Sequence, residues 1–447
     1  MSRHADAIRL QLAKAPLPGR QLFELIGVSQ PTGSRALRAL GSEIVRLGAA
    51  RSIQYALRDN ARGLPDILVH RIDAEGQIRR LGTLIPVRPE GFVMLHENGV
   101  ALHSDGLPWW LFDMRPQGYL GRAYAARHGA ALGLPERLND WTDTHALRAL
   151  LAHGHDLVGN LLLGDVARER FLAGPPPSPI EEEGKAVQYA RLAGEAARGE
   201  VPGSSAGGEQ PKFTAFAATP NGPCHVIVKF SEVVEGPVSE RWRDLLLAEH
   251  LALETLREAG IPAAVTRVAD HGAQRFLEVE RFDRVGPTGR RALISLAAMD
   301  AEFIGAGTGG WPGIAQRLAK AGQIVTEAAD AANLLWSFGT LIGNTDMHSG
   351  NLSFISEHGR PYAIAPAYDM TPMCFAPRIG GGLPDTIADA ALHPGIANEV
   401  WRRAEPLSQA FLHRLRAASG FSRRFAPCIA ALEDHIARVG RKIARLG

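Results

Sequence analysis

Three polar side chains with the chemistry of a catalytic and metal-binding site lie close together in the C-terminal half of the chain. Asp346 and Asn351 are five residues apart in TDMHSGN, and Asp369 ends the later stretch PYAIAPAYD. A carboxylate can orient and deprotonate a hydroxyl, whereas an amide oxygen and a second carboxylate are hard ligands suited to Mg²⁺. The pattern indicates phosphoryl transfer, with Asp346 as catalytic base and Asn351 and Asp369 as metal ligands.

An Asp and an Asn at this spacing also occur by chance, and Asp346 could simply cap a turn. The neighbouring sequence favours the chemical interpretation. A nearly all-apolar helix is predicted over AANLLWSFGTLIGN, directly before the loop, and a β-hairpin built from NLSFI and PYAIAPAYD would return Asp369 beside Asn351. Protein kinases use the same Asp-to-Asn step in their catalytic loop.

A lysine and a glutamate upstream could hold the phosphates of a nucleotide. Lys229 lies on the second strand of a hairpin predicted from KFTAFAA and HVIVKF, and Glu249 falls on the apolar stripe of the following helix. A carboxylate among core residues is costly unless it is paired, so we expect Glu249 to pair with Lys229, as in kinases. A solvated Glu249 at the edge of the stripe is the alternative.

A glycine- and serine-rich segment precedes this hairpin. The amides of Gly207 and Gly208, with Ser205 just before them, could approach an anion closely. The segment is not a P-loop, because a lysine does not follow the glycines directly and no helix is predicted to begin there. Taken alone, it could equally be a linker followed by an ordinary strand lysine.

The first 62 residues carry an excess of positive charge, with ten Lys and Arg against four acids, whereas the rest of the chain holds 39 against 43. Helices predicted over about 5–14, 19–27 and 29–44, followed by a strand, a glycine turn and a strand, are typical of a winged helix-turn-helix. Such a domain would bind double-stranded DNA, commonly as a homodimer. A helical cap or dimerisation module with a solvated basic face is the alternative. The residues expected to contact DNA are Gln30, Thr32, Ser34, Arg35 and Arg38.

The composition as a whole is that of a globular protein of several domains. Hydrophobic residues make up 45% of the 447 residues, and no window approaches the roughly 18 uninterrupted apolar residues of a membrane span. The N-terminus lacks the basic and apolar regions of a signal peptide, and the three cysteines lie far apart. We therefore expect a cytoplasmic protein without a membrane partner. The His153-x-His155 pair is expected to be a surface or structural pair rather than part of a metal site.

The motifs GGEQPK, HVIVKF, VERFDR, GNTDMHSGN and PAYD resemble those of the HipA family of bacterial serine/threonine kinases, the toxins of type II toxin–antitoxin pairs. The resemblance covers roughly residues 64–447, and the fused helix-turn-helix makes the chain most similar to the YjjJ-type members. It implies an α+β, two-lobed protein-kinase-like fold and Mg²⁺-dependent transfer of the γ-phosphate of ATP to a protein serine. The family's best-known target is a glutamyl-tRNA synthetase, so a tRNA synthetase or another translation factor could be the substrate.

The resemblance also implies roles for individual residues. Many members carry an autophosphorylated serine directly before the Gly-x-Gln of the glycine-rich loop, where this chain has Gly207. Some relatives have a second serine two residues earlier, and Ser205 matches that position, so it could be autophosphorylated. The residues implied to bind ATP are Lys229, Glu280, Phe282, His348, Gly207 and Gly208.

The expected domain organisation follows from these motifs and from the linker-like sequence GPPPSPIEEEG. An alternative function is a nucleotide-sensing transcriptional regulator with a catalytically silent kinase-like domain, but the intact set of Asp346, Asn351 and Asp369 favours catalysis. The expected segments are a winged helix-turn-helix over 1–62, a subdomain with a β-rich start over 63–173, a linker over 174–184, a kinase N-lobe over 185–285 and a helical C-lobe over 286–447.

Overall fold

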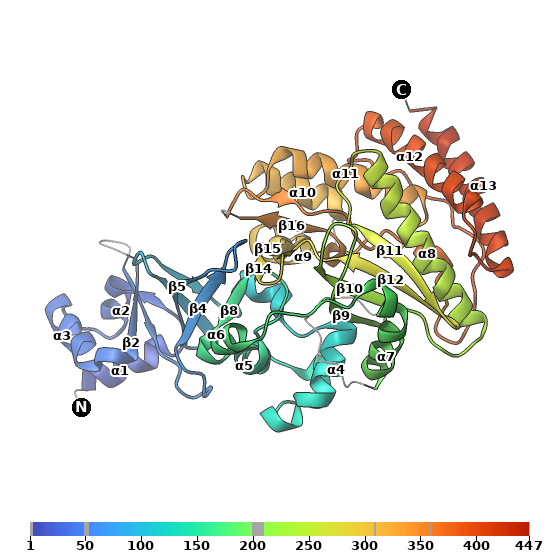
Figure 1. Cartoon of the computed structure of the whole chain (residues 1–447). Coiled ribbons are helices and arrows are strands. Elements are labelled where there is room, and N and C mark those ends of the chain that lie inside the picture. Colours follow the sequence, from blue (N-terminus) through green and yellow to red (C-terminus); the bar gives the residue numbers. More distant parts are fainter. Residues whose placement is uncertain (1–2, 49–52, 199–209, 308–309, 358, 447) are drawn as a thin grey trace.

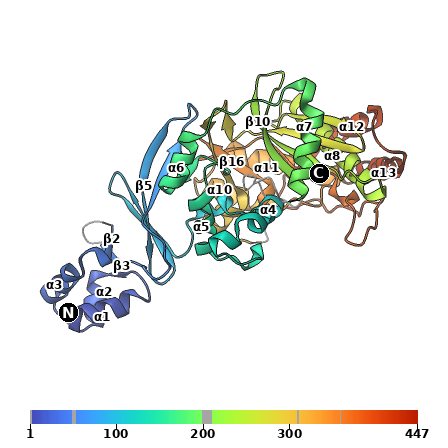
Figure 2. The same ribbon diagram turned by 60° about the horizontal axis from the view of Figure 1, so that its bottom comes forward.

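The structure is a computed structural model, and it combines helices and sheets along the whole chain, in agreement with the α+β expectation. Figures 1 and 2 show the N-terminal residues at one end of the molecule and the C-terminal helices at the other. None of the helices in the described part of the chain has both the length and the apolar character that a membrane crossing needs. The described residues are 3–48, 53–198, 210–307, 310–357 and 359–446.

The described residues up to Arg62, here called the head, form three helices packed around a small sheet with the order β1-β3-β2. Their shared core contains Ile8, Leu12 and Leu22. A Cβ at Gly33 would lie 2.2 Å from the ring of Phe23, so glycine is what lets the second and third helices approach. The elements are α1 (Arg3–Leu12), α2 (Gly19–Leu25), α3 (Gln30–Leu40), β1 (Leu17–Pro18), β2 (Ile44–Leu47) and β3 (Gln54–Leu57).

The third helix begins as predicted, with Ser29 at its N-cap, but it ends at Leu40 rather than at residue 44. Gly41 has a φ of 53°, which ends the helix, and a 3-10 turn, η1 (Gly41–Glu43), then leads into β2. The apolar spacing that continued to Ile44 therefore belongs to a strand. Helix and strand periods coincide over so short a run, which explains the error in the predicted boundary.

Residues 63–173, here called the middle segment, contain a five-stranded antiparallel sheet with the order β7-β6-β5-β4-β8. The β-rich start predicted for this region corresponds to the strands β4 to β7. Helices and a 3-10 turn cover the sheet and lead toward the C-terminal half. The elements are β4 (Ile67–Ile72), β5 (Ile78–Val87), β6 (Gly91–His96), β7 (Ala101–Ser104), η3 (Trp109–Met114), α4 (Gly118–His128), α5 (Asp143–His153), β8 (Leu161–Leu163) and α6 (Gly164–Ala173).

The head is joined to the middle segment by main-chain hydrogen bonds and by a common core. The amide of Arg88 donates to the carbonyl of Leu57, and the amide of Asp59 donates to that of Pro86, at 2.8 and 2.9 Å. Figure 2 shows β5 extending between the head and the rest of the molecule. The joint core consists of Val45, Leu47, Ala56, Ile85, Val87 and Val93.

The stretch 174–184, expected to lack regular structure, is mostly irregular but is anchored at one point. Ile180 forms a parallel bridge with Ala217, at the edge of the next sheet. A 3-10 turn, η6 (Glu182–Gly184), then leads into α7 (Lys185–Ala197).

The next sheet is four-stranded and antiparallel, with the order β11-β12-β10-β9. Because side chains alternate along a strand, Val226 and Val228 face α7, whereas Lys229 faces the opposite side, where α8 lies. The predicted hairpin is confirmed, because β9 and β10 pair in antiparallel register. The elements are β9 (Lys212–Ala217), β10 (Cys224–Phe230), α8 (Pro237–Glu258), β11 (Thr266–His271) and β12 (Gln274–Glu280).

The remaining chain is mainly helical and surrounds one large core, in which the predicted apolar helix is α11. The predicted hairpin after TDMHSGN is present as β16 and β17, and β15 completes its sheet. The elements are β13 (Arg284–Val285), β14 (Gly289–Arg290), β15 (Ala292–Ser295), α9 (Leu296–Phe303), α10 (Gly310–Lys320), α11 (Thr326–Leu341), β16 (Ser353–Ser356), β17 (Ala363–Ile364), α12 (Asn398–Ala417) and α13 (Ala426–Ile443).

Candidate active site

A lysine and two carboxylates meet below the four-stranded sheet. Nζ of Lys229, on β10, lies 2.6 and 2.8 Å from the two carboxylate oxygens of Glu249, on α8. The same nitrogen lies 2.5 Å from Oδ1 of Asp369. The hydroxyl of Thr371 donates to Glu249 at 2.9 Å, so this buried carboxylate has partners for both oxygens.

Asp369 has an unusual main chain. Among the described residues it is the only one other than glycine with a positive φ, 54°. Residues other than glycine rarely adopt a positive φ, and those that do are often found at functional sites. The side-chain amide of Asn344, in the loop that precedes β16, donates to the main-chain carbonyl of Asp369 at 3.3 Å and helps to hold this conformation.

The charges of this group stabilise one another. Burial lowers the pKa of Lys229, but the carboxylates of Asp369 and Glu249 outweigh it and raise that pKa above its ordinary value. For the acid Asp369, burial acts in the opposite direction and raises the pKa. The charges of Lys229 and Lys212 outweigh burial and lower that pKa below its ordinary value. At neutral pH, Asp369 is therefore an anion next to a fixed cation.

The loop after α11 brings the other predicted residues together. The side-chain amide of Asn351 donates to the main-chain carbonyl of Asp346 at 2.8 Å, and the main-chain amide of Asp346 donates to Asn344 Oδ1 at 3.0 Å. These bonds close the loop and leave the carboxylate of Asp346 52% exposed. Nε2 of His348 lies 4.0 Å from that carboxylate.

A cavity of about 380 Å³ lies between the sheet and this loop. Its apolar walls, which include Ile227, Val279 and Leu293, suit a flat ring system, and its charged end suits an anionic group. Glu249 lies behind Lys229, and Asp346 stands outside the described lining. The predicted site residues that line the cavity are Lys229, Glu280, Phe282, His348, Asn351 and Asp369.

Two of these lining residues have further contacts that orient them, and a third has a shifted pKa. The ring of Phe282 lies 5.8 Å from that of Tyr368, centroid to centroid. Nδ1 of His348 accepts a hydrogen bond from the amide of Gly350 at 3.0 Å, which orients its ring. Burial raises the pKa of Glu280 above its ordinary value, and Arg267 opposes that rise.

Some lining residues were not predicted from the sequence. Lys212 stands directly opposite Lys229 in the pairing of β9 with β10, and the strand register within GGEQPK could have revealed it. The middle segment contributes side chains that no local motif marks. One of them, Asp113, accepts hydrogen bonds from the amide and hydroxyl of Ser295, both at 2.6 Å, across 182 residues of sequence. The four lining residues of the middle segment are Phe112, Asp113, Gln117 and Val158.

The other predicted residues are placed elsewhere. Gly207, Gly208 and Ser205 lie outside the described residues. His153 packs against His128, with 4.3 Å between ring centroids, and Nδ1 of His153 lies 2.8 Å from the hydroxyl of Tyr124. Among the described residues, no group of three or more His, Cys, Asp and Glu side chains could hold a metal ion.

The residues expected to contact DNA all lie on α3, far from the cavity (Figure 1). Gln30, Arg35 and Arg38 are exposed, whereas Thr32 and Ser34 are partly buried. The guanidinium groups of Arg35 and Arg38 each donate to a main-chain oxygen one helical turn earlier at 3.4 Å, and no acid pairs with either in the described part of the head. This face of the head is available to a polyanion.

The residues of the cavity fit a magnesium–nucleotide complex better than a metal bound by protein alone. Asp369 offers an ionised carboxylate. The side-chain nitrogen of Asn351 contacts Asp346, and its Oδ1 accepts no hydrogen bond from a described residue. Mg²⁺ commonly takes one or two protein ligands and completes its shell with phosphate oxygens and water. Two hard oxygen donors at the charged end of an apolar cavity meet that need.

Comparison with known families matches two parts of the chain. Residues 64–172 match the family described as "YjjJ-like toxin, middle domain", and residues 204–436 match the "HipA-like C-terminal domain". Toxin YjjJ of Escherichia coli (strain K12) is 37% identical over 439 residues, which is 98% of either chain.

Comparison with solved structures gives similarity at low sequence identity. One chain of the complex of HipA, HipB and operator DNA from Shewanella oneidensis MR-1 matches with a TM-score of 0.53 and 16% identity, over 84% of this chain and 97% of that chain. The Helicobacter pylori proinflammatory kinase CtkA matches with a TM-score of 0.38 and 13% identity, over 53% and 93% of the two chains. The first of these similarities shows a common fold.

Proposed function

This chain belongs to the HipA-like toxin family, with YjjJ-like toxins among its members, and from that premise we propose that it is an ATP-dependent serine/threonine protein kinase. The observation that carries the proposal is the meeting of Lys229, Glu249 and Asp369 beside a cavity that Asn351 also lines. Phosphoryl transfer needs positioning and charge neutralisation more than covalent chemistry, and these side chains provide both.

Each residue of the site has a distinct task in this proposal. Lys229, held by Glu249, would bind the phosphates of ATP, and Asn351 and Asp369 would hold Mg²⁺. The metal would neutralise negative charge on the transferred phosphate. Glu280 and Phe282 would contact the adenine part of the nucleotide in the apolar region of the cavity, and His348 would lie near the nucleotide.

Asp346 would orient the acceptor hydroxyl and accept its proton. Its carboxylate is half exposed and stands just outside the cavity lining, where a side chain of another protein can reach it. A buried carboxylate would favour a small acceptor enclosed with the nucleotide. The exposure of Asp346 therefore supports a protein substrate, and a tRNA synthetase or another translation factor remains our expectation for it.

We further propose that the head binds double-stranded DNA through α3 as a winged helix-turn-helix, with a homodimer as the binding species. The three helices, the small sheet and the exposed basic residues of α3 support this. The structurally similar HipA chain is described in a complex with HipB and operator DNA. In this chain the head would supply DNA binding itself.

One observation favours a second candidate function, a nucleotide-sensing regulator without catalysis. Lys229 contacts Asp369 directly, and a silent site could keep this ion pair permanently. The carboxylate of Asp346 has no structural task that would require it in such a protein, because its loop is closed by main-chain and amide groups. The catalytic proposal therefore accounts for more of the site.

Incubation of the purified protein with γ-labelled ATP and a cell extract tests the proposal, with Mg²⁺ or with excess EDTA. The kinase proposal predicts Mg²⁺-dependent label on serine or threonine of one or a few proteins. Saturable ATP binding with no transfer under any of these conditions would instead support the silent regulator. Peptide mapping of the same samples tests Ser205, because autophosphorylation there would place label between Gly203 and Lys212.

A further inference from the structure

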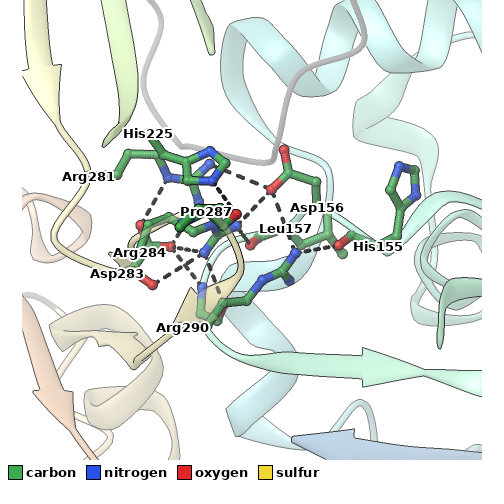
Figure 3. Close-up of polar contacts among 10 residues, drawn as sticks. His155, Asp156, Leu157, His225, Arg281, Asp283, Arg284, Pro287 and Arg290 are labelled. Atoms are coloured by element: carbon green, nitrogen blue, oxygen red, sulfur yellow. Dashed lines mark hydrogen bonds and ion pairs between the residues drawn. The ribbon is translucent and has the colours of Figure 1, made fainter. Parts of the chain in front are cut away.

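Three arginines converge at the boundary between the middle segment and the C-terminal half (Figure 3). Arg281, Arg284 and Arg290 lie in and around the β13–β14 hairpin and are only 7, 7 and 5% exposed. Buried guanidinium groups are costly unless carboxylates compensate them. Two carboxylates do so here, Asp283 from the same hairpin region and Asp156 from the middle segment.

Asp156 is the anion that all three arginines share. Its Oδ1 lies 2.9 Å from Arg284, and 3.9 Å from both Arg281 and Arg290. The side chain is 44% exposed, so it covers the solvent side of a group whose other members are buried. Asp283 compensates the opposite side, at 2.8 Å from Arg281 and 2.7 Å from Arg284.

Main-chain contacts make the same boundary continuous. Arg290 and Arg284 each donate a hydrogen bond of 2.5 Å to a carbonyl of the middle segment, that of His155 and that of Leu157 respectively. In return, the amide of Gly159 donates to Asp283 at 3.2 Å. The loop 155–159 is thus attached to the arginine group at both of its ends.

The charge balance of the group depends on Asp156. Three guanidinium groups face two carboxylates, and without Asp156 they would face one. Burial first, and the neighbouring Arg284 next, lower the pKa of Arg290 to about 9, so its charged form is less favoured than that of an ordinary arginine. Nη1 of Arg290 also lacks a hydrogen-bond partner among the described residues. Loss of a carboxylate would therefore push the guanidinium groups apart.

This boundary forms part of the candidate nucleotide cavity, because Val158, Arg281 and Asp283 all line it. We propose that Asp156 is a positioning residue for nucleotide binding, which holds the loop 155–159 against the β13–β14 hairpin and so fixes one wall of the cavity. The middle segment is then a component of the nucleotide site rather than a separate module. This inference rests on the proposed function, since it concerns the affinity of the same site for ATP.

The test is Mg-ATP titration by calorimetry with the full chain. Asp156→Asn removes the charge and keeps the shape, and we expect it to weaken Mg-ATP binding by roughly 10- to 100-fold, the effect of a small displacement in a positioned site. The double variant Asp156→Asn/Arg290→Gln restores the net charge of the group, so it should recover part of the affinity for Mg-ATP. Arg290 is the arginine to replace because it does not line the cavity. Glu169→Gln, an exposed acid on α6, is the matched control and should bind like wild type.

The outcomes separate the two proposals. Wild type that binds no Mg-ATP would reject the proposed function and this role with it. Wild-type binding with equal affinity in Asp156→Asn would reject the positioning role alone. If Asp156→Asn does not fold, recovery of a cooperative melting transition in the double variant supports the charge-balance argument, and failure of both variants overturns it.

Discussion

The side-chain nitrogen of Asn351 donates a hydrogen bond to the main-chain carbonyl of Asp346, 2.8 Å away. Asn351 also lines the cavity, together with Asp369. One side chain thus both closes the loop that carries Asp346 and forms part of the cavity wall. That bond spans the five residues whose spacing marks this motif in the sequence.

Lys229→Ala is expected to weaken both nucleotide binding and folding. The change leaves the buried carboxylate of Glu249 and that of Asp369 without their shared cation, and breaking a buried pair from one side costs about 3–5 kcal/mol. Urea denaturation measures the free energy of unfolding, and an ATP titration measures the affinity. Lys320→Ala, at an exposed lysine of α10, is the control. An ATP affinity of Lys229→Ala equal to that of wild type would contradict a role for this lysine in ATP binding.

Arg35→Ala and Arg38→Ala are each expected to weaken DNA binding and to reduce its salt dependence. A lost phosphate contact lowers the slope of log K against log salt concentration by roughly one. Fluorescence anisotropy with labelled duplex DNA at several salt concentrations measures both quantities. Arg20→Ala changes an arginine of α2 that is 93% exposed and should have little effect. Equal slopes in all three variants would argue against α3 as the contact surface.

The stability of the middle segment is expected to fall as the pH is lowered from about 6.5 toward 4. Burial and the neighbouring charges of His128 and Arg170 lower the pKa of His153 to about 4, whereas an unfolded histidine titrates near 6.5. Between these values the unfolded state binds more protons, so acid favours unfolding. The melting temperature should therefore drop more between pH 7.5 and 5 in wild type than in His153→Gln. An equal drop in both would contradict this assignment.

Sequence patterns predicted the local elements of the site well, because their causes are local. The apolar stripe around Glu249 required a buried cation, and the chain provides Lys229 on the neighbouring strand. The turn between NLSFI and PYAIAPAYD required a hairpin, which is present as β16 and β17. The unusual φ of Asp369 could not be predicted, because nothing in the preceding residues demands it.

The contribution of the middle segment to the cavity was missed for a different reason. Asp113 meets Ser295, and Asp156 meets Arg284, through contacts between segments separated by 182 and 128 residues. Such contacts depend on how whole domains pack, and no spacing or periodicity in a single sequence encodes them. The excess of arginines in VERFDRVGPTGRR was visible, but the anion that balances them lies in a region with weak sequence signals.

The most direct test of the catalytic account compares Asp346→Asn with wild type in a phosphoryl-transfer assay with γ-labelled ATP. The account predicts that turnover falls by roughly 10²–10⁴, the usual contribution of a general base, while the affinity for Mg-ATP stays near that of wild type. Asp330→Asn, at an exposed acid of α11, serves as the control and should transfer phosphate normally. Unchanged turnover in Asp346→Asn would contradict the account.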